Sequence, residues 1–423
     1  MFWRKKQPIK SSNKSPKPSS ETKSGSRVFE GDRTLWIIFT VLIVISILVV
    51  YSSTAKMTYE VGSNMSLFDA LQKQIMYVMM AIMLIFVVHK IDYKAYMRWS
   101  FVLYLFFVAC TIATYFVGVN LNDSSRWLKI GFFTFQPSEG LKITTILMLA
   151  RAMESRQAII NNIKILPTTL KIKSREFKEV FWNNTLPLIG PVVVSCGVIL
   201  PAHTSSAAIV FITSLIMLYI GRVHLKEIMK FFMVVFSVGM LGIFSLVMLD
   251  AGRIDTAKNR ITKWTHEWTH ESTATTINDI SDTQRALIAI REGGIVGKGA
   301  GQSTSRVLVT HPESDYAYAF FISEYGVIAG LILILLYIWI FFRAMDIGQQ
   351  CRTPFPTLMT LGLGLLITGQ ALLHILVQVN FMPETGQTLP FISRGGSSLL
   401  FSTLALGMII SVSRTNYNNK ISR

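Results

Sequence analysis

Ten runs of apolar residues, each close to the length that crosses a lipid bilayer, recur along this chain. A hydrocarbon core about 30 Å thick takes roughly 20 helical residues. Backbone polar groups inside such a core are satisfied only by helices or closed barrels, so we expect each run to be a helix. The runs lie near residues 35–52, 74–91, 101–118, 137–152, 184–201, 206–221, 230–249, 317–342, 356–379 and 396–413. The sequence therefore predicts an all-α, polytopic membrane protein of about ten transmembrane helices.

The basic residues are distributed as a membrane topology requires. The chain has 41 Lys and Arg against 24 Asp and Glu, a net charge of +17, yet only 15% of its residues are charged. The cations lie mostly in tails and loops between the apolar runs, which is typical of the positive-inside rule rather than of nucleic-acid binding. With a cytoplasmic N-terminus, 27 of them fall on the cytoplasmic side and 13 outside. We therefore expect both termini in the cytoplasm and no nucleic-acid partner.

The chain divides into a tail, a membrane domain and a short C-terminus. Residues 1–33 are rich in Lys, Ser and Pro and poor in apolar residues, which predicts a disordered basic cytoplasmic tail. Residues 34–415 form the predicted membrane domain, and residues 416–423 a short cytoplasmic C-terminus. Between the seventh and eighth runs, residues 250–316 form a long extracytoplasmic loop. Because a few residues suffice to connect two helices, a loop of this length is expected to carry function.

The first candidate segment leads into the fourth apolar run. Arg126 and Lys129 flank Trp127 at a membrane interface, where two cations can bind a lipid phosphate while the ring rests on acyl chains. An ordinary aromatic belt with snorkelling cations has the same composition, and from this segment alone it is the stronger interpretation. Glu139 and Lys142 are three residues apart on one helix face, which predicts an ion pair. Because charges inside a span are costly, the pair is either functional or a packing lock.

The second candidate segment closes the long loop. A glycine-rich run at 293–303 surrounds Lys298 and permits tight turns and close approach of backbone N–H groups to an anion. Its spacing is not that of a nucleotide-binding P-loop, and no Ser or Thr follows Lys298, so a nucleotide site is not predicted. Asp315 stands just before the eighth run, where partial desolvation suits a general base. The alternative is a carboxylate that caps the N-terminus of a helix.

The third candidate segment, residues 383–398, separates the ninth and tenth runs and ends at Ser397 and Ser398. Its two prolines and three glycines prevent regular structure. Irregular backbone at membrane depth is tolerated only where protein buries it or where it lines a wet cavity, so we expect a re-entrant loop at a cavity mouth.

A zinc-protease pattern at 266–270, His-Glu-Trp-Thr-His, arises from a tandem Trp-Thr-His-Glu in a polar loop. It lacks a well-spaced third ligand, and no metal site is predicted there.

Taken together, the three segments resemble the SEDS family, the membrane glycosyltransferases FtsW, RodA and SpoVE of cell-wall synthesis. The resemblance extends from about residue 34 to residue 415, and its most specific part is Leu-Pro-Phe-Ile-Ser-x-Gly-Gly-Ser-Ser at 389–398. The block at 126–142 and the run at 293–315 occur in the family's order. The long basic tail is more similar to FtsW than to RodA, although tails vary easily.

The resemblance implies a peptidoglycan glycosyltransferase of the bacterial cytoplasmic membrane. Such an enzyme polymerises lipid II into glycan strands at the outer face, during cell division or shape maintenance. Asp315 aligns with the family's essential aspartate, which implies that it is the catalytic base. The residues that the resemblance places around the substrate are Arg126, Trp127, Lys129, Glu139, Lys142, Lys298, Arg306, Ser397 and Ser398.

The resemblance also implies partners. These are lipid II and the undecaprenyl-pyrophosphate-linked glycan as substrates, a class B penicillin-binding transpeptidase, and other divisome proteins. No cofactor is implied with certainty. A divalent cation, Mg²⁺ or Mn²⁺, is chemically compatible with Asp315 and a lipid pyrophosphate.

The sequence departs from the family pattern at several positions around the expected site, including Asn380 at a Gly position. His203 stands where the family has Asp or Asn, Ser323 where it has Glu, His374 where it has Asn, and Arg394 where Tyr is common. These departures keep two alternatives open, a lipid II flippase and a non-catalytic scaffold that recruits a transpeptidase. Retention of Asp315 favours the enzyme, and so does the gathering of candidate charges in the outer half of the membrane.

Overall fold

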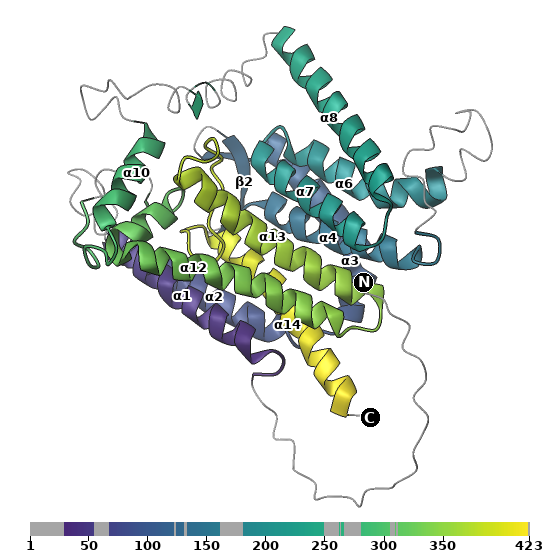
Figure 1. Cartoon of the computed structure of the whole chain (residues 1–423), viewed down its shortest axis with the longest axis horizontal. Helices are drawn as coiled ribbons and strands as arrows, with labels where there is room; N and C mark the ends of the chain where they lie inside the picture. Colours follow the sequence, from purple (N-terminus) through teal and green to yellow (C-terminus); the bar gives the residue numbers. More distant parts are fainter. Residues whose placement is uncertain are drawn as a thin grey trace, which may run out of the picture.

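The described part of the chain is a bundle of long helices joined by short connections (Figure 1). The computed structural model describes residues 29–54, 67–121, 124–130, 133–160, 181–248, 262, 264–265, 281–304, 309 and 312–421. The helices are α1 (Arg33–Thr54), α2 (Leu67–Val88), α3 (Tyr93–Val117), α4 (Pro137–Ser155), the π-helical turn η2 (Phe181–Thr185) continuous with α6 (Leu186–Ile199), α7 (Thr204–Ile220), α8 (Leu225–Met248), α10 (Asp282–Gly293), α12 (Ala317–Gln349), α13 (Pro354–Gln378) and α14 (Gly396–Ile421).

Each of the ten predicted apolar runs coincides with a helix, so the predicted all-α polytopic membrane fold is confirmed. Within the described residues, seven helices have the length and hydropathy needed to cross a membrane. Among the other three, α7 is apolar but has only 17 residues, and α4 carries the charged residues Glu139 and Lys142. The chain is therefore a multi-pass membrane protein.

The ends of helices α1 and α14 can be compared with the predicted domain limits. Helix α1 begins at Arg33, and residues 1–28 of the predicted tail lie outside the described residues. At the other end, α14 continues to Ile421, into the predicted C-terminal segment, because no Pro or Gly follows Gly407 to end it. Much of the predicted 250–316 loop, including the zinc-protease pattern at 266–270, also lies outside the described residues.

A small antiparallel sheet joins α3 to α4, which the expectation of helices alone did not include. Strands β1 (Val119–Leu121), β2 (Ser124–Ile130) and β3 (Phe133–Phe135) lie in the order β1-β2-β3. Trp127 is paired with Val119, and Leu128 with Phe135. β-branched and aromatic residues favour strands, and strands separated by only two residues are typical of hairpins. The sheet fixes the backbone of the first candidate segment.

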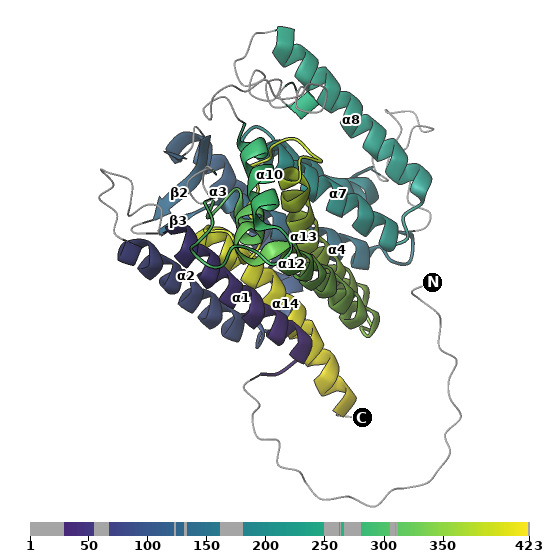
Figure 2. The ribbon, with the colours of Figure 1, turned by 60° about the vertical axis from the view of Figure 1, so that its left-hand side comes forward.

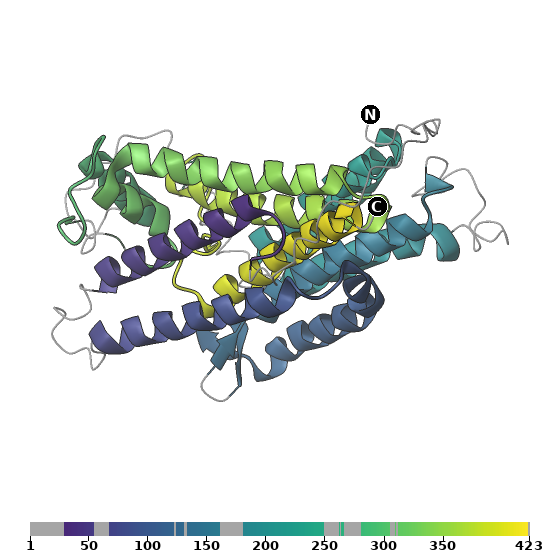
Figure 3. The ribbon, with the colours of Figure 1, turned by 90° about the horizontal axis from the view of Figure 1, so that it is seen from below.

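Helices α13 and α14 form the centre of the bundle, and α8 lies at its edge. In the most apolar stretch of α13 and of α14, 72% of the positions are buried, against 22% in α3, whose other positions are free to face lipid. Both views of the bundle place α8 beyond α7, away from α12 and α13 (Figures 1 and 2). Seen from below, α14 lies between α12 on one side and α2 on the other (Figure 3).

Helix α12 is broken at Gly326, and the glycine-rich run packs against the break. Gly326 has φ 82° and ψ 169°, which frees backbone groups on both sides of it. The N–H groups of Lys298 and Gly299 donate to the carbonyls of Ser323 and Glu324, at 3.2 and 2.9 Å. In return the N–H of Val327 donates to the carbonyl of Gly294 at 3.0 Å. This exchange holds the end of α10 and the glycine-rich run against α12.

Candidate active site

A buried ion pair opens the candidate site on α4. Lys142 Nζ lies 2.8 Å from Glu139 Oε1, and the two side chains are 1% and 8% exposed. The pair that the three-residue spacing predicts is therefore present. Glu139 also lies in the first turn of α4, where the helix dipole favours a negative charge.

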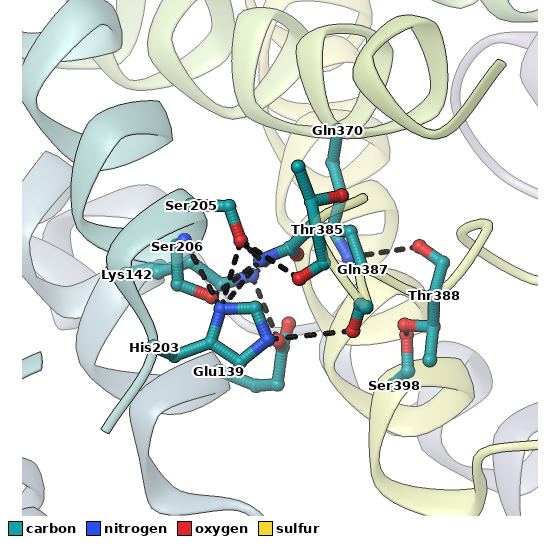
Figure 4. Close-up of polar contacts among 11 residues, drawn as sticks. Glu139, Lys142, His203, Ser205, Ser206, Gln370, Thr385, Gln387, Thr388 and Ser398 are labelled. Atoms are coloured by element: carbon teal, nitrogen blue, oxygen red, sulfur yellow. Dashed lines mark hydrogen bonds and ion pairs between the residues drawn. The ribbon is translucent and has the colours of Figure 1, made fainter. Parts of the chain in front are cut away.

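The ion pair is linked to the third candidate segment through Gln370 of α13. Lys142 Nζ donates to Gln370 Oε1 at 2.9 Å, and Gln370 Nε2 donates to the carbonyl of Thr388 at 3.2 Å (Figure 4). The Thr388 hydroxyl then donates to Ser398 Oγ at 2.8 Å. Ser398 and Ser397, both predicted site residues, are buried at the start of α14. The first and third segments therefore meet in one polar network.

A second set of contacts joins the N-terminus of α7 to the same segment. His203 caps α7, with Nδ1 accepting from the backbone N–H of Ser206 at 3.3 Å. Gln387 Nε2 contacts His203 Nδ1 at 3.0 Å, Ser205 Oγ at 3.0 Å and Ser206 Oγ at 2.8 Å (Figure 4). His203, expected from the resemblance to replace an Asp or Asn, thus caps α7 and contacts the loop as well.

Asp315 lies at the meeting point of the second and third segments. It is partly buried, two residues before the start of α12. The N–H of Arg394 donates to the carbonyl of Glu313 at 2.6 Å, and Ser393 Oγ donates to the carbonyl of Ser314 at 2.7 Å. The residues on either side of Asp315 are thus tied to the 383–398 segment and to α12. The first and second candidate segments therefore both contact the third, residues 383–398.

Glu384 connects this junction to α10. Its Oε1 accepts hydrogen bonds from Thr283 Oγ1 at 3.0 Å and from the Tyr316 hydroxyl at 3.1 Å. Burial, followed by the negative charge of Glu384, raises the pKa of the Tyr316 phenol, so the phenol remains a donor. The described part of the predicted extracytoplasmic loop is therefore anchored to the site.

The remaining predicted site residues are less closely engaged. Trp127 is half-buried and Lys129 exposed on β2, and the side chain of Arg126 on the same strand lies outside the described residues. Lys298 is exposed, and Arg306 lies outside the described residues. The backbone N–H groups of Lys298 and Gly299 donate to carbonyls of α12, so these two groups are not available to bind an anion as the sequence suggested. Here Gly293 and Gly297 serve close packing against the α12 backbone.

Sequence reasoning missed three glutamines that hold the network together. Helix α13 carries two of them, Gln370 and Gln378. His374 lies midway between these two, so the three α13 residues are spaced four apart on one helix face. Gln387 lies in the loop. The signal was available, because uncharged polar residues recurring at helical spacing inside an apolar run are expected to face a polar interior.

The architecture defines a class before it defines a family, namely a polytopic helical membrane protein with a buried polar junction at one end. The sequence pattern of the FtsW/RodA/SpoVE family, described as cell cycle proteins, matches residues 32–418. This chain belongs to that family, and the family expected from its three segments is confirmed. As a member it is a multi-pass protein of the bacterial inner membrane.

Similar proteins cover almost the whole chain. The stage V sporulation protein E of Bacillus subtilis (strain 168) is 26% identical over 387 residues, which cover 90% of this chain and 97% of that protein. The probable peptidoglycan glycosyltransferase FtsW of Thiomonas intermedia (strain K12) is 27% identical over 408 residues, covering 94% of this chain and 91% of that protein.

Two solved structures share the fold. RodA of Thermus thermophilus has a TM-score of 0.60 at 19% identity, and a chain of a peptidoglycan synthase complex has a TM-score of 0.65 at 17% identity. Each match covers 92% of this chain and 98% of the other.

Proposed function

We propose that this protein is a peptidoglycan glycosyltransferase that polymerises lipid II at the outer face of the cytoplasmic membrane. Its family membership supports the proposal, as do relatives that carry the name probable peptidoglycan glycosyltransferase FtsW. The observation that carries it is the convergence of three segments. The Lys142–Gln370–Thr388 contacts join α4 to the loop, and Ser393 joins the loop to the backbone beside Asp315.

Asp315 is the proposed base. The 4-hydroxyl oxygen of the incoming lipid II attacks the anomeric carbon of the growing chain and forms the new glycosidic bond. The bond from that carbon to the polyprenyl pyrophosphate breaks, and the pyrophosphate leaves with the electron pair. The hydroxyl proton passes to the Asp315 carboxylate. A partly buried carboxylate just before a helix suits this transfer, because partial desolvation makes it a better proton acceptor.

The other proposed site residues divide into two groups. Arg126, Trp127 and Lys129 on the small sheet, with Lys298 and Arg306, are proposed contacts for the pyrophosphate and its lipid. Cations at such positions stabilise charge that develops on the leaving group. The buried residues Glu139, Lys142, Ser397 and Ser398 are proposed to shape the site from within, because burial keeps them away from bulk solvent.

A divalent cation is compatible with these residues. Among the described residues no group of three or more His, Cys, Asp or Glu side chains is placed to hold a metal ion. Mg²⁺ is commonly held by one or two carboxylates together with substrate phosphates, so Asp315 and the lipid pyrophosphate would suffice. When bound, the cation would neutralise charge on the leaving pyrophosphate.

The proposed setting is a membrane complex. Both termini are proposed to be cytoplasmic, which is supported by the excess of Lys and Arg on that side of the predicted spans. The proposed partner is a class B penicillin-binding transpeptidase among other divisome proteins. This is supported by the shared fold with a chain of a peptidoglycan synthase complex that coordinates polymerisation and crosslinking.

The test is lipid II polymerisation by the purified protein, with and without the transpeptidase. Wild type is compared with Asp315→Ala and with Asp346→Ala, an aspartate near the opposite end of α12 that pairs with Arg343 at 3.2 Å. Glycan from wild type and Asp346→Ala, and none from folded Asp315→Ala, is the expected result. Equal product from all three would remove Asp315 from the mechanism. No product from wild type with the partner present would overturn the proposal in favour of the flippase or the scaffold.

A further inference from the structure

A network of hydrogen-bonded residues links the backbone of Asp315 to the N-terminus of α7. Gln378 of α13 is fully buried and contacts the carbonyl of Asp315, the N–H of Ala319 and the ring of His374. His374 in turn contacts the carbonyl of Gln387, and the Gln387 amide contacts His203. Two positions where the sequence departs from its family, His203 and His374, are therefore members of one network.

The donor or acceptor character of each group fixes the direction of the hydrogen bonds around Gln378 and His374. The N–H of Ala319 donates to Gln378 Oε1 at 2.5 Å, so Gln378 Nε2 is the atom that donates to the Asp315 carbonyl at 3.2 Å. The same Nε2 faces His374 Nε2, which must accept because an amide nitrogen only donates. His374 Nδ1 donates to the Gln387 carbonyl at 2.7 Å, since a carbonyl oxygen only accepts.

The same reasoning continues to His203. Gln387 Nε2 lies 3.0 Å from His203 Nδ1, which accepts from the N–H of Ser206, and His203 Nε2 donates to the carbonyl of Gly386 at 3.3 Å. His374 thus bonds to the main-chain carbonyl of Gln387, whereas Gln387 contacts His203 through its side-chain amide, so the residue itself joins the two sets of contacts. Both imidazoles are required in the neutral form, with the proton on Nδ1 of His374 and on Nε2 of His203.

We propose that His374 and Gln378 are positioning residues that hold the backbone of Asp315 in place for catalysis, with His374 orienting the Gln378 amide through its unprotonated Nε2. The proposal rests on the proposed function for the role of Asp315. Gln378 bonds both to the carbonyl of Asp315 and to the N–H of Ala319 in the first turn of α12. His374 prevents the Gln378 amide from turning over, because a turned amide would place its oxygen against the His374 acceptor and the Asp315 carbonyl.

Two substitutions of His374 separate its two bonds. His374→Gln places a side-chain oxygen near the position of Nε2, so it keeps an acceptor for Gln378 and loses the donor to Gln387. His374→Asn places a side-chain nitrogen near the position of Nδ1, so it keeps the donor to Gln387 and loses the acceptor for Gln378. Gln378→Leu removes all three contacts of the Gln378 side chain, to Asp315, Ala319 and His374. His89→Asn is the matched control, a buried histidine just after α2 whose Nδ1 bonds to the Ile85 carbonyl at 2.9 Å.

The first readout is polymerisation kinetics in detergent with the transpeptidase present. Gln378→Leu and His374→Asn are expected to lower kcat on the order of tenfold to a hundredfold with KM for lipid II nearly unchanged, because a small displacement of a catalytic group costs that much. His374→Gln and His89→Asn are expected to keep kcat within about threefold of wild type. The reverse order, with His374→Asn active and His374→Gln inactive, would show that His374 serves only to anchor the loop and would overturn the proposal.

The second readout is hydrogen exchange of the peptide that contains Ala319, which does not depend on any activity. Loss of Gln378 Oε1 frees the Ala319 amide, so exchange in Gln378→Leu and His374→Asn is expected to rise at least tenfold, and not in His374→Gln or His89→Asn. Unchanged exchange in Gln378→Leu would overturn the proposal even if wild type polymerises lipid II. If wild type polymerises no lipid II but exchange is still faster in Gln378→Leu than in wild type, the Gln378 contacts are supported and the proposed function is refuted.

Discussion

Gly326 lies so close to Ile295 that a Cβ atom at position 326 would stand 2.2 Å from the Ile295 carbonyl oxygen. The approach is reciprocal, because a Cβ at Gly297 would stand 2.2 Å from the carbonyl oxygen of Glu324. Two glycines of the run at 293–303, Gly293 and Gly297, are therefore explained by contact with the broken helix α12. This contact holds residues 293–299 against α12.

Gly326→Ala is expected to destabilise the protein. The residue has φ +82°, which costs a non-glycine residue about 1–3 kcal/mol, and the added methyl group meets backbone that cannot turn aside. A lower midpoint of thermal unfolding in detergent would show this. Gly369→Ala in α13 is the matched control, since a Cβ there has no neighbour within 4 Å and alanine favours the helix. An unchanged midpoint for Gly326→Ala would contradict the close contact.

Lys142→Met is expected to cost more stability than the double substitution with Glu139→Gln. The single change leaves a buried carboxylate and the Gln370 oxygen without the ammonium, a loss of roughly 3–5 kcal/mol for a pair of this kind. Removing both charges spares that penalty. A double-mutant cycle on thermal unfolding measures the coupling. Equal losses for the single and double variants would mean that the ion pair contributes little beyond packing.

The helices and the ion pair were predictable from sequence because both depend on local spacing. An apolar run reports a span by its length, and Glu139 and Lys142 report their contact by three-residue spacing on one helix. The network around Asp315 was not predictable, since it joins residues such as Gln387 and His203, which are 184 positions apart. Nothing in the local sequence sets such a distance. The break in α12 at Gly326 was missed for another reason. An isolated glycine in an apolar run also fits a straight helix.

The protein is expected to lose stability as the pH falls below about 6.5 through His89, which directly follows α2. Burial lowers the pKa of His89, and so do the nearby Arg414 and Lys90, whereas the Ile85 carbonyl and Glu30 act the other way. The ring packs edge-on against Trp36 and Phe86. The folded state therefore binds fewer protons than the unfolded state, so this contribution is complete above pH 6.5 and is lost as the pH falls.

The measurement for His89 is thermal unfolding between pH 7.5 and pH 5 for wild type and His89→Asn. Other groups also titrate in this range, so the difference between the two proteins carries the result. The fall of the midpoint toward acid pH is expected to be shallower in the variant, which has no imidazole to protonate. Parallel curves would mean that His89 takes up its proton without cost in the folded state.

Glu384→Ala is expected to loosen α10 from the loop that carries the site. The change removes the acceptor for both Thr283 and Tyr316, and the Tyr316 ring is buried, so its hydroxyl is left without this partner in a site shielded from water. A buried donor left without its acceptor costs about 1–3 kcal/mol. Faster hydrogen exchange in residues 282–293, with α13 unchanged, is the expected signature. Tyr316→Phe and Thr283→Val each remove one bond and leave no orphaned donor, so each should cost less than Glu384→Ala. If Tyr316→Phe alone matched the effect of Glu384→Ala, the Thr283 bond would contribute nothing, and α10 would be held to the site by its packing on α12 alone.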